Sequence, residues 1–322
     1  MTLSWFFRWT DRWAHPLAPA LAPLIVLCVL GLVFWLSAGR GGDYIRSAIP
    51  IRQAIGTSLL FVLMPAYQLL MATLLYRRTR WLLKELEPYA ASAALTSVGE
   101  RLHRAPRWSW LSLGIGAVFG LSQNYFVFET FSSLSPHPFD LAFVLGNCLL
   151  WAAVALMLSW WLPISLQTAR LGASLPVDLH RLDRLQPLAR VATLDVLIVA
   201  GALALMPLQS LDAEFRLENY VWGIAIGVPV ALYLFLLPLL GARRSIRAAK
   251  TARIASLNKT LDAMDRSDVE PLELLLGHRD RIAAIPDWPL NTRLITRAIV
   301  YVIIPPLAWV AAALVDNVVD RF

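Results

Sequence analysis

Residues Val221–Leu240 read VWGIAIGVPVALYLFLLPLL, an uncharged and mostly apolar run. About 20 residues of this kind cross the hydrocarbon core of a bilayer as a helix. The run therefore predicts a membrane-spanning helix. Arg243 and Arg244 follow it closely, as cations do at the cytoplasmic end of a span.

Six further stretches have the same character: Leu17–Leu36, Ala54–Tyr76, Trp108–Thr130, Leu141–Ile164, Val191–Gln209 and Leu294–Leu314. The composition agrees with them, since 58% of the residues are hydrophobic and 16% are charged, against roughly 25% charged in soluble domains. The first stretch has the length of a span rather than of a signal peptide. We predict an all-α, polytopic bundle of seven transmembrane helices.

The basic residues decide the predicted orientation. With a cytoplasmic amino terminus, 24 of the 29 Lys and Arg residues fall on the cytoplasmic side, and this bias sets how multispan proteins insert. The carboxyl terminus is then external. Arg greatly outnumbers Lys and Ala and Leu abound, which indicates a GC-rich bacterial genome and hence a bacterial inner membrane.

The spans and the segments between them form one integrated domain. Residues 1–241 hold six spans with cytoplasmic loops 77–107 and 168–190, residues 242–290 form a cytoplasmic helical linker, and residues 291–322 hold the last transmembrane helix. Eleven basic residues lie between Arg243 and Arg297. The linker is therefore the most basic part of the predicted cytoplasmic face.

The linker reads as two helices followed by a hinge. The first continues the sixth span, with Leu257 and Leu261 on its apolar face as candidate subunit contacts. The second covers Glu270–Ala284 and must stop at Pro286-Asp287-Trp288-Pro289, because proline cannot continue a helix. We expect these four residues to form a hinge before the last span.

The third predicted span has the most polar interior. It carries Gln123 and Asn124, with Glu129 near the outer boundary. Gly116 and Gly120 precede Asn124 at intervals of four, a smooth stripe on which a second helix can pack closely. The amides either hydrogen-bond across this helix contact or line a permeation path or ligand pocket.

Other spans carry isolated polar or small residues. Gln68, Asn147 and Asp195 are the remaining polar candidates, and Asp195 is either neutralised by Arg170 or Arg190 or part of a proton relay. A second small-residue stripe contains Gly223 and Gly227. Such stripes are typical of packing or oligomer contacts.

Pro305 and Pro306 remove two backbone donors from the last span. They predict either a packed kink or a broken helix whose carbonyl groups line a pore.

Several functions lack the residues they require. Asp178, His180 and Asp183 match no specific metal signature, so we expect no metal and no cofactor. No nucleophile with a matching base can be recognised, which argues against an enzyme. The cations flank spans rather than forming a nucleic-acid-binding stripe.

Three stretches resemble a family of bacterial multispan membrane proteins: DLHRLDRLQPLAR (178–190), RRSIRAAKTARIASLN (243–258) and RDRIAAIPDWP (279–289). The resemblance covers about the carboxyl-terminal half and implies no activity, ligand or site residue. The overall layout is also similar to that of the insect chemoreceptor-type ion channels, in which the last helix joins subunits and lines the pore. That family's Tyr/Gln-Phe signature is missing from the last helix here.

The sequence favours an oligomeric ion channel or ligand-gated pore in the lipid bilayer, taking an ion or small solute. The alternatives are a non-transporting scaffold or signalling component acting through the linker, and a small-solute transporter. The expected partners of the protein are lipid and further copies of the same chain, and no nucleic acid is expected to bind.

Overall fold

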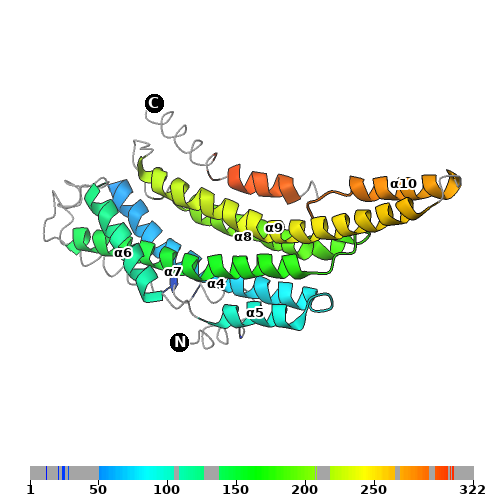
Figure 1. Cartoon of the computed structure of the whole chain (residues 1–322). Coiled ribbons are helices and arrows are strands. Elements are labelled where there is room, and N and C mark those ends of the chain that lie inside the picture. The colour runs from blue at the N-terminus through cyan, green and yellow to red at the C-terminus, as the bar shows by residue number, and fades with distance from the viewer. Residues whose placement is uncertain are drawn as a thin grey trace, which may run out of the picture.

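The computed structural model of the chain describes residues 51–104, 109–126, 138–206, 208, 218–264, 269–289 and 294–303, with a few single residues elsewhere. All regular structure in these ranges is helical, which confirms the all-α prediction for them (Figure 1). The elements are α4 (Ile51–Leu86), α5 (Ser92–His103), α6 (Ser109–Phe126), α7 (Pro138–Ser174), the 3-10 helix η2 (Leu182–Leu185), α8 (Gln186–Ala204), α9 (Glu218–Ala263), α10 (Val269–Ala284) and a helix over Leu294–Ile303.

Four of the described helices are long and apolar enough to cross a membrane, judged by length and composition. They contain the segments Ser58–Leu86, Phe143–Ser174, Leu182–Ala204 and Trp222–Ala263. The chain is therefore compatible with an integral membrane protein. These segments correspond to the predicted second, fourth, fifth and sixth spans.

The other three predicted spans are described only in part or not at all. The stretch Leu17–Leu36 lies outside the described residues, apart from single positions. Helix α6 covers most of the third predicted span, but its serines and its Gln123 and Asn124 make it too polar to count among the four. Only Leu294–Ile303 of the last predicted span is described as a continuous helix.

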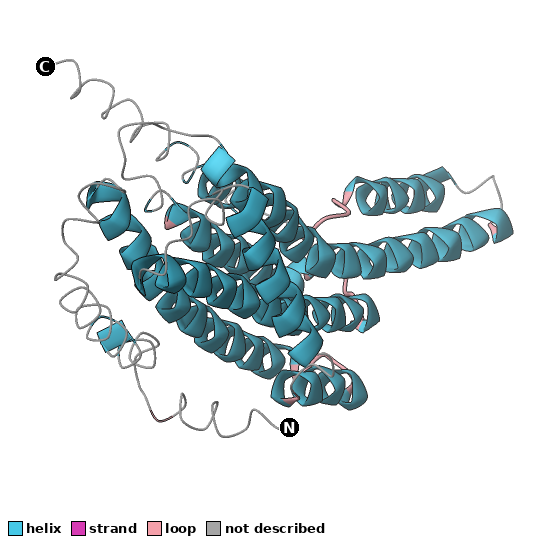
Figure 2. Cartoon of the chain, turned by 90° about the vertical axis from the view of Figure 1, so that its left-hand side faces the viewer, coloured by secondary structure: helices cyan, strands magenta, loops and turns pink. Residues whose placement is uncertain are grey.

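Helices α4, α7, α9 and α8 form a closed ring, in which each packs against the next (Figures 1 and 2). Helix α6 covers the outside of α7 near one end of the bundle, and α5 packs on α4 and α7. Helix α10 packs back on α9, and the two project together from the opposite end (Figure 1). We call the projecting pair the α9–α10 hairpin.

The outer surface of the bundle is apolar and its interior holds polar groups. Trp110, Val118, Leu145 and Leu149 are all more than 60% exposed. In contrast, Gln68, Asn124, Asn147 and Asp195 are less than 10% exposed. This distribution suits a helix bundle surrounded by lipid, where polar groups must find partners inside the protein.

Two helices are much longer than a bilayer requires. Helix α7 has 37 residues and α9 has 46, about 55 and 70 Å at 1.5 Å per residue, whereas the hydrocarbon core is about 30 Å thick. Their ends continue into a second apolar core, made by Leu82, Leu86, Val98, Leu171, Leu175, Leu185, Leu188, Val191, Ala242 and Ile246. Arg77, Arg78, Arg80, Arg170 and Arg190 lie on the same helix segments, so we call this end of the bundle the arginine-rich end.

The segments 77–107 and 168–190, predicted as loops, are largely helical in the described residues. Helix α4 continues ten residues beyond Tyr76 to Leu86, and α5 follows it. Helix α7 continues beyond Ile164 to Ser174 and α8 begins at Gln186. The helices continue because their apolar faces do, and those faces form the second core.

Candidate functional site

The amide side chains of α6 and α7 meet at one backbone carbonyl. Asn124 Nδ2 donates to Gly120 O at 3.0 Å, and Asn147 Nδ2 donates to the same oxygen at 3.1 Å. Asn124, Asn147 and Gln123 are 0%, 1% and 7% exposed. In a single copy of the chain these three side chains therefore face the protein interior rather than an open path.

The glycine stripe of α6 lies against the backbone of α7. A Cβ atom at Gly120 would lie 2.8 Å from Asn147 O and from Cys148 Cα, and one at Gly116 would lie 2.6 Å from Ala152 Cα. Only glycine permits helices to approach this closely. The close approach also brings Asn147 within reach of Gly120 O.

Arg78 and Asp195 form a buried ion pair between α4 and α8. The distance from Nη2 to Oδ1 is 2.8 Å, and the side chains are 6% and 0% exposed. The indole of Trp161 on α7 lies beside the same carboxylate. A charge inside a helix bundle requires such a partner, because desolvation otherwise disfavours the charged form.

The partner of Asp195 is therefore Arg78, rather than Arg170 or Arg190 as the sequence suggested. Sequence reasoning placed Arg78 in a loop because four basic residues follow Tyr76 within eight positions. Leu75, Arg78 and Leu82, which are all buried, are spaced as residues on one face of a helix are. This spacing is the feature of the sequence that indicates a helix at Arg78. It puts the guanidinium on the face of α4 that packs into the bundle.

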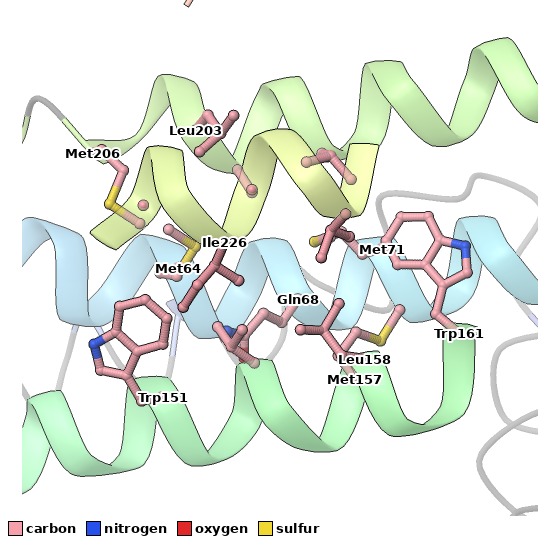
Figure 3. A pocket seen from close by; sticks show the side chains of 16 residues that line it. Met64, Gln68, Met71, Trp151, Met157, Leu158, Trp161, Leu203, Met206 and Ile226 are labelled. Carbon is pink, nitrogen blue, oxygen red and sulfur yellow. The ribbon is translucent and has the colours of Figure 1, made fainter. Parts of the chain in front are cut away.

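A cavity of about 80 Å³ lies inside the ring of α4, α7, α8 and α9 (Figure 3). Trp151 and Trp161 lie at its two ends, and Gln68 lies between them. Gln68 is the only side chain of the lining with an amide group; apolar side chains and glycines supply most of the rest. Four of the chain's six methionines contribute: Met64, Met71, Met157 and Met206.

Gly223 and Gly227 line this cavity from α9. A Cβ atom at Gly223 would meet Met206 Sδ at 3.3 Å, and one at Gly227 would meet Leu203 Cδ2 at 2.6 Å. Both neighbours are flexible side chains, Leu203 on α8 and Met206 just beyond the end of that helix. The second glycine stripe therefore faces α8 and the cavity within one copy of the chain.

Trp161 lines the cavity and also lies beside the Arg78–Asp195 ion pair. Beyond it, Ser165 Oγ is buried without a hydrogen-bond partner among the described residues. Gln68 Nε2 makes only a long contact of 3.5 Å to Leu150 O. The sequence did not predict the cavity, because its lining comes from four separate helices with no shared motif.

The predicted hinge Pro286–Pro289 is held against α9. Lys250 Nζ donates to Ile285 O at 2.8 Å and lies 3.2 Å from Asp287 Oδ1, and Arg247 Nε lies 3.2 Å from Asp287 Oδ2. The guanidinium of Arg243 lies 4.6 Å from the centre of the Trp288 ring. We call these contacts the 286–289 clamp.

The clamp fixes the approach to the last helix. Trp288 and Leu294 pack on a small core of Ala189, Ala192 and Leu239 from α8 and α9. The pKa of the Asp287 carboxyl lies below its ordinary value, because Lys250 donates a hydrogen bond to it and the cations of Lys250, Arg247 and Arg243 lie nearby. Pro286 is exposed and Pro289 is buried.

The two leucines predicted as subunit contacts differ in exposure. Leu257 is 6% exposed and is buried within one copy of the chain, so it is unavailable to a second copy in this arrangement. Leu261 is half-buried. On α10, Leu274 is 69% exposed and is the better position for an intermolecular contact.

The remaining predicted positions are described in part. Glu129 and Pro306 lie outside the described residues, while Pro305 is helical and buried. Within the described ranges, no three His, Cys, Asp or Glu side chains are grouped as a metal site would require. His180 instead stacks on His278, with ring centres 6.4 Å apart.

Comparison of the chain with protein-family models, curated proteins and solved structures finds no significant match.

Proposed function

We propose that the chain is an integral membrane protein that binds a small apolar molecule between α4, α7, α8 and α9. The observation that carries this proposal is the cavity of about 80 Å³ inside the helix ring. A single water needs about 10–15 Å³ of such space. The cavity therefore has room for more than an ordered water.

The chemistry of the lining favours an apolar occupant. Cavities lined by apolar side chains stay dry and take apolar molecules. Methionine side chains are flexible and polarizable, so the four around this cavity can adjust to the shape of a ligand. Gln68 adds one group that can hydrogen-bond a polar atom of the ligand.

The surroundings of the cavity support access from the membrane. The outer faces of the helix ring are apolar, with Leu194, Leu197, Leu232 and Leu236 at least 40% exposed. A small apolar molecule concentrates in the bilayer that such faces contact. It would then reach the cavity by a local parting of two helices.

Quenching of tryptophan fluorescence by xenon, a small apolar probe, tests this proposal, because Trp151 and Trp161 lie at the two ends of the cavity. We expect a saturable component above the linear partition of the probe into detergent or lipid. Gly223→Leu fills the cavity, since Gly223 lines it and the atoms nearest to a Cβ there belong to the flexible Met206 side chain. It should remove the saturable component.

Gly114→Leu is the matched control, because a Cβ atom added at Gly114 meets nothing within 4 Å. It should keep the saturable quenching. Absence of that component from the natural protein, or its persistence in Gly223→Leu, would overturn the proposal.

An oligomeric ion channel, with seven spans and a cytoplasmic amino terminus, is the second candidate. The described part of the last helix favours it by exposing Ile295, Ile299, Val300 and Ile303, a face open to a second copy. The buried Gln123, Asn124 and Asn147 argue for a pore between copies rather than within one. Planar-bilayer recordings test it, and a strictly monomeric, non-conducting protein would contradict it.

The scaffold alternative is supported by the projecting α9–α10 hairpin (Figure 1). Crosslinking from Leu274→Cys separates it from the channel, since Leu274 is 69% exposed on that hairpin. Crosslinks between copies favour the channel, whereas crosslinks to a different protein favour the scaffold.

A further inference from the structure

A second hollow lies at the arginine-rich end of the bundle. It shares no lining residue with the cavity inside the helix ring. Its volume is about 430 Å³. One wall comes from residues 177–180 between α7 and η2, a second comes from α9, and Ile282 of α10 also lines it. We call it the 177–180 groove.

The α9 wall carries a cation and a hydroxyl. Arg253 and Ser256 are three residues apart on α9, so both side chains can reach one bound group. Arg247 and Lys250 are engaged with Asp287. Arg253, in contrast, has no ion-pair partner among the described residues. A guanidinium next to a hydroxyl is a suitable arrangement for a phosphate group.

The opposite wall carries an aromatic ring in a fixed position. His180 stacks on His278 of α10 with an angle of 28° between the rings. The turn is held by Asp178 Oδ1, which accepts a hydrogen bond from the His180 backbone N–H at 3.0 Å. His180 can therefore offer its imidazole to a planar ligand, while Asp178 can accept a hydrogen bond from it.

The floor of the groove leaves room for such a ligand. Ala249 and Ala252 face it from α9, and their small side chains keep the space between the two walls open. The groove is shallow and open to solvent, with a volume of about 430 Å³.

We propose that the 177–180 groove binds a phosphate monoester carried on a flat heteroaromatic ring, the chemistry of a nucleoside monophosphate. Arg253 and Ser256 hold the phosphate, His180 stacks on the ring, and Asp178 accepts a hydrogen bond from a ring or sugar donor. The site is independent of the cavity inside the helix ring. Either proposal can therefore fail without the other.

Isothermal titration of the purified full-length chain with AMP tests the site. We expect saturable binding, with adenosine and inorganic phosphate each binding at least tenfold more weakly. Absence of saturable AMP binding up to millimolar concentrations overturns the proposal. Inorganic phosphate that binds as tightly as AMP also overturns it, because the ring would then contribute nothing.

Two pairs of variants assign the roles. Arg253→Gln should weaken AMP binding at least tenfold, whereas Arg244→Gln, which removes another exposed arginine of α9 outside the groove, should leave it unchanged. Equal losses in both variants would indicate general attraction to a basic surface and overturn the site. His180→Phe should retain binding and His180→Ala should lose it, because only the former keeps a stacking ring.

A phosphate group could also come from a lipid headgroup, and competition separates these sources. Dihexanoyl phosphatidic acid presents a phosphate monoester without a ring. We expect it to displace AMP only at concentrations at least tenfold above those of AMP. Displacement at lower concentrations would overturn the assignment to a ring-bearing ligand.

Discussion

Arg78 of α4 and Asp195 of α8 form a 2.8 Å ion pair in which neither side chain is more than 6% exposed. The pair joins two residues that are 117 positions apart in the sequence. It lies next to Trp161, which also lines the cavity inside the helix ring. The ion pair is therefore part of the packing that holds the cavity in shape.

Removing one partner of this pair should be strongly destabilising. Asp195→Asn leaves the guanidinium of Arg78 buried without a countercharge, which costs about 3–5 kcal/mol. The double variant Arg78→Met, Asp195→Leu should recover most of this loss, because both charges are gone. Unfolding of the protein in detergent measures both effects.

The exposed pair Arg104–Glu100 provides the control. Its atoms are 3.0 Å apart, but the side chains are 68% and 52% exposed. Glu100→Gln should change the free energy of unfolding by less than about 1 kcal/mol, since water screens exposed pairs. If Asp195→Asn changed the free energy of unfolding by as little as this, the buried pair would have no structural role.

Gly120→Leu should separate α6 from α7. A Cβ atom there meets the α7 backbone at 2.8 Å, so the helices must move apart, at a cost of about 1–3 kcal/mol or more. The hydrogen bond that Asn147 of α7 donates to Gly120 O should be lost as well, whereas the bond from Asn124 lies within α6. Thermal unfolding measures the change, with Gly114→Leu on the open side of α6 as the neutral control.

Tyr67→Phe should loosen the contact between α4 and α8. The Tyr67 hydroxyl donates to Ile198 O at 2.7 Å, and loss of such a bond typically costs about 0.5–1.5 kcal/mol. Tyr233→Phe, at a position 39% exposed, should leave unfolding unchanged. Equal shifts in the two variants would show that the Tyr67 bond contributes nothing specific.

Asp287→Asn should open the 286–289 clamp. The amide keeps its shape but loses the charge that attracts Arg247 and Lys250. Hydrogen exchange of the 283–289 backbone should become faster than in the natural protein. Asp280→Asn is the control, because Asp280 is 71% exposed and outside the clamp.

The same clamp should respond to acid. The pKa of Asp287 is lowered by the hydrogen bond from Lys250 and by the neighbouring cations, so its contribution to stability is present above the unfolded pKa and is lost as pH falls through the lower folded value. Exchange, corrected for the intrinsic rate, should be constant between about pH 5 and 8 and rise only below about pH 4. Faster exchange near neutral pH would contradict the assignment of this transition to Asp287.

The sequence alone determined the continuity of α9 and the place of α10. The apolar run of Val221–Leu240 and the periodic pattern after it predict one helix through the sixth span and beyond, and α9 is continuous from Glu218 to Ala263. The helix predicted over Glu270–Ala284 is α10, bounded at Val269 and Ala284. These features depend on hydrophobic periodicity and on proline, both of which act within a few residues.

Only the tertiary structure decided which groups meet. The sequence contains Arg78 and Asp195, yet their pairing depends on how α4 and α8 pack. In the same way, four helices that share no motif line the cavity, and α9 holds Asp287 in the clamp. The physical reason is that periodicity defines the face a helix buries, whereas close approach between helices determines which partner that face receives.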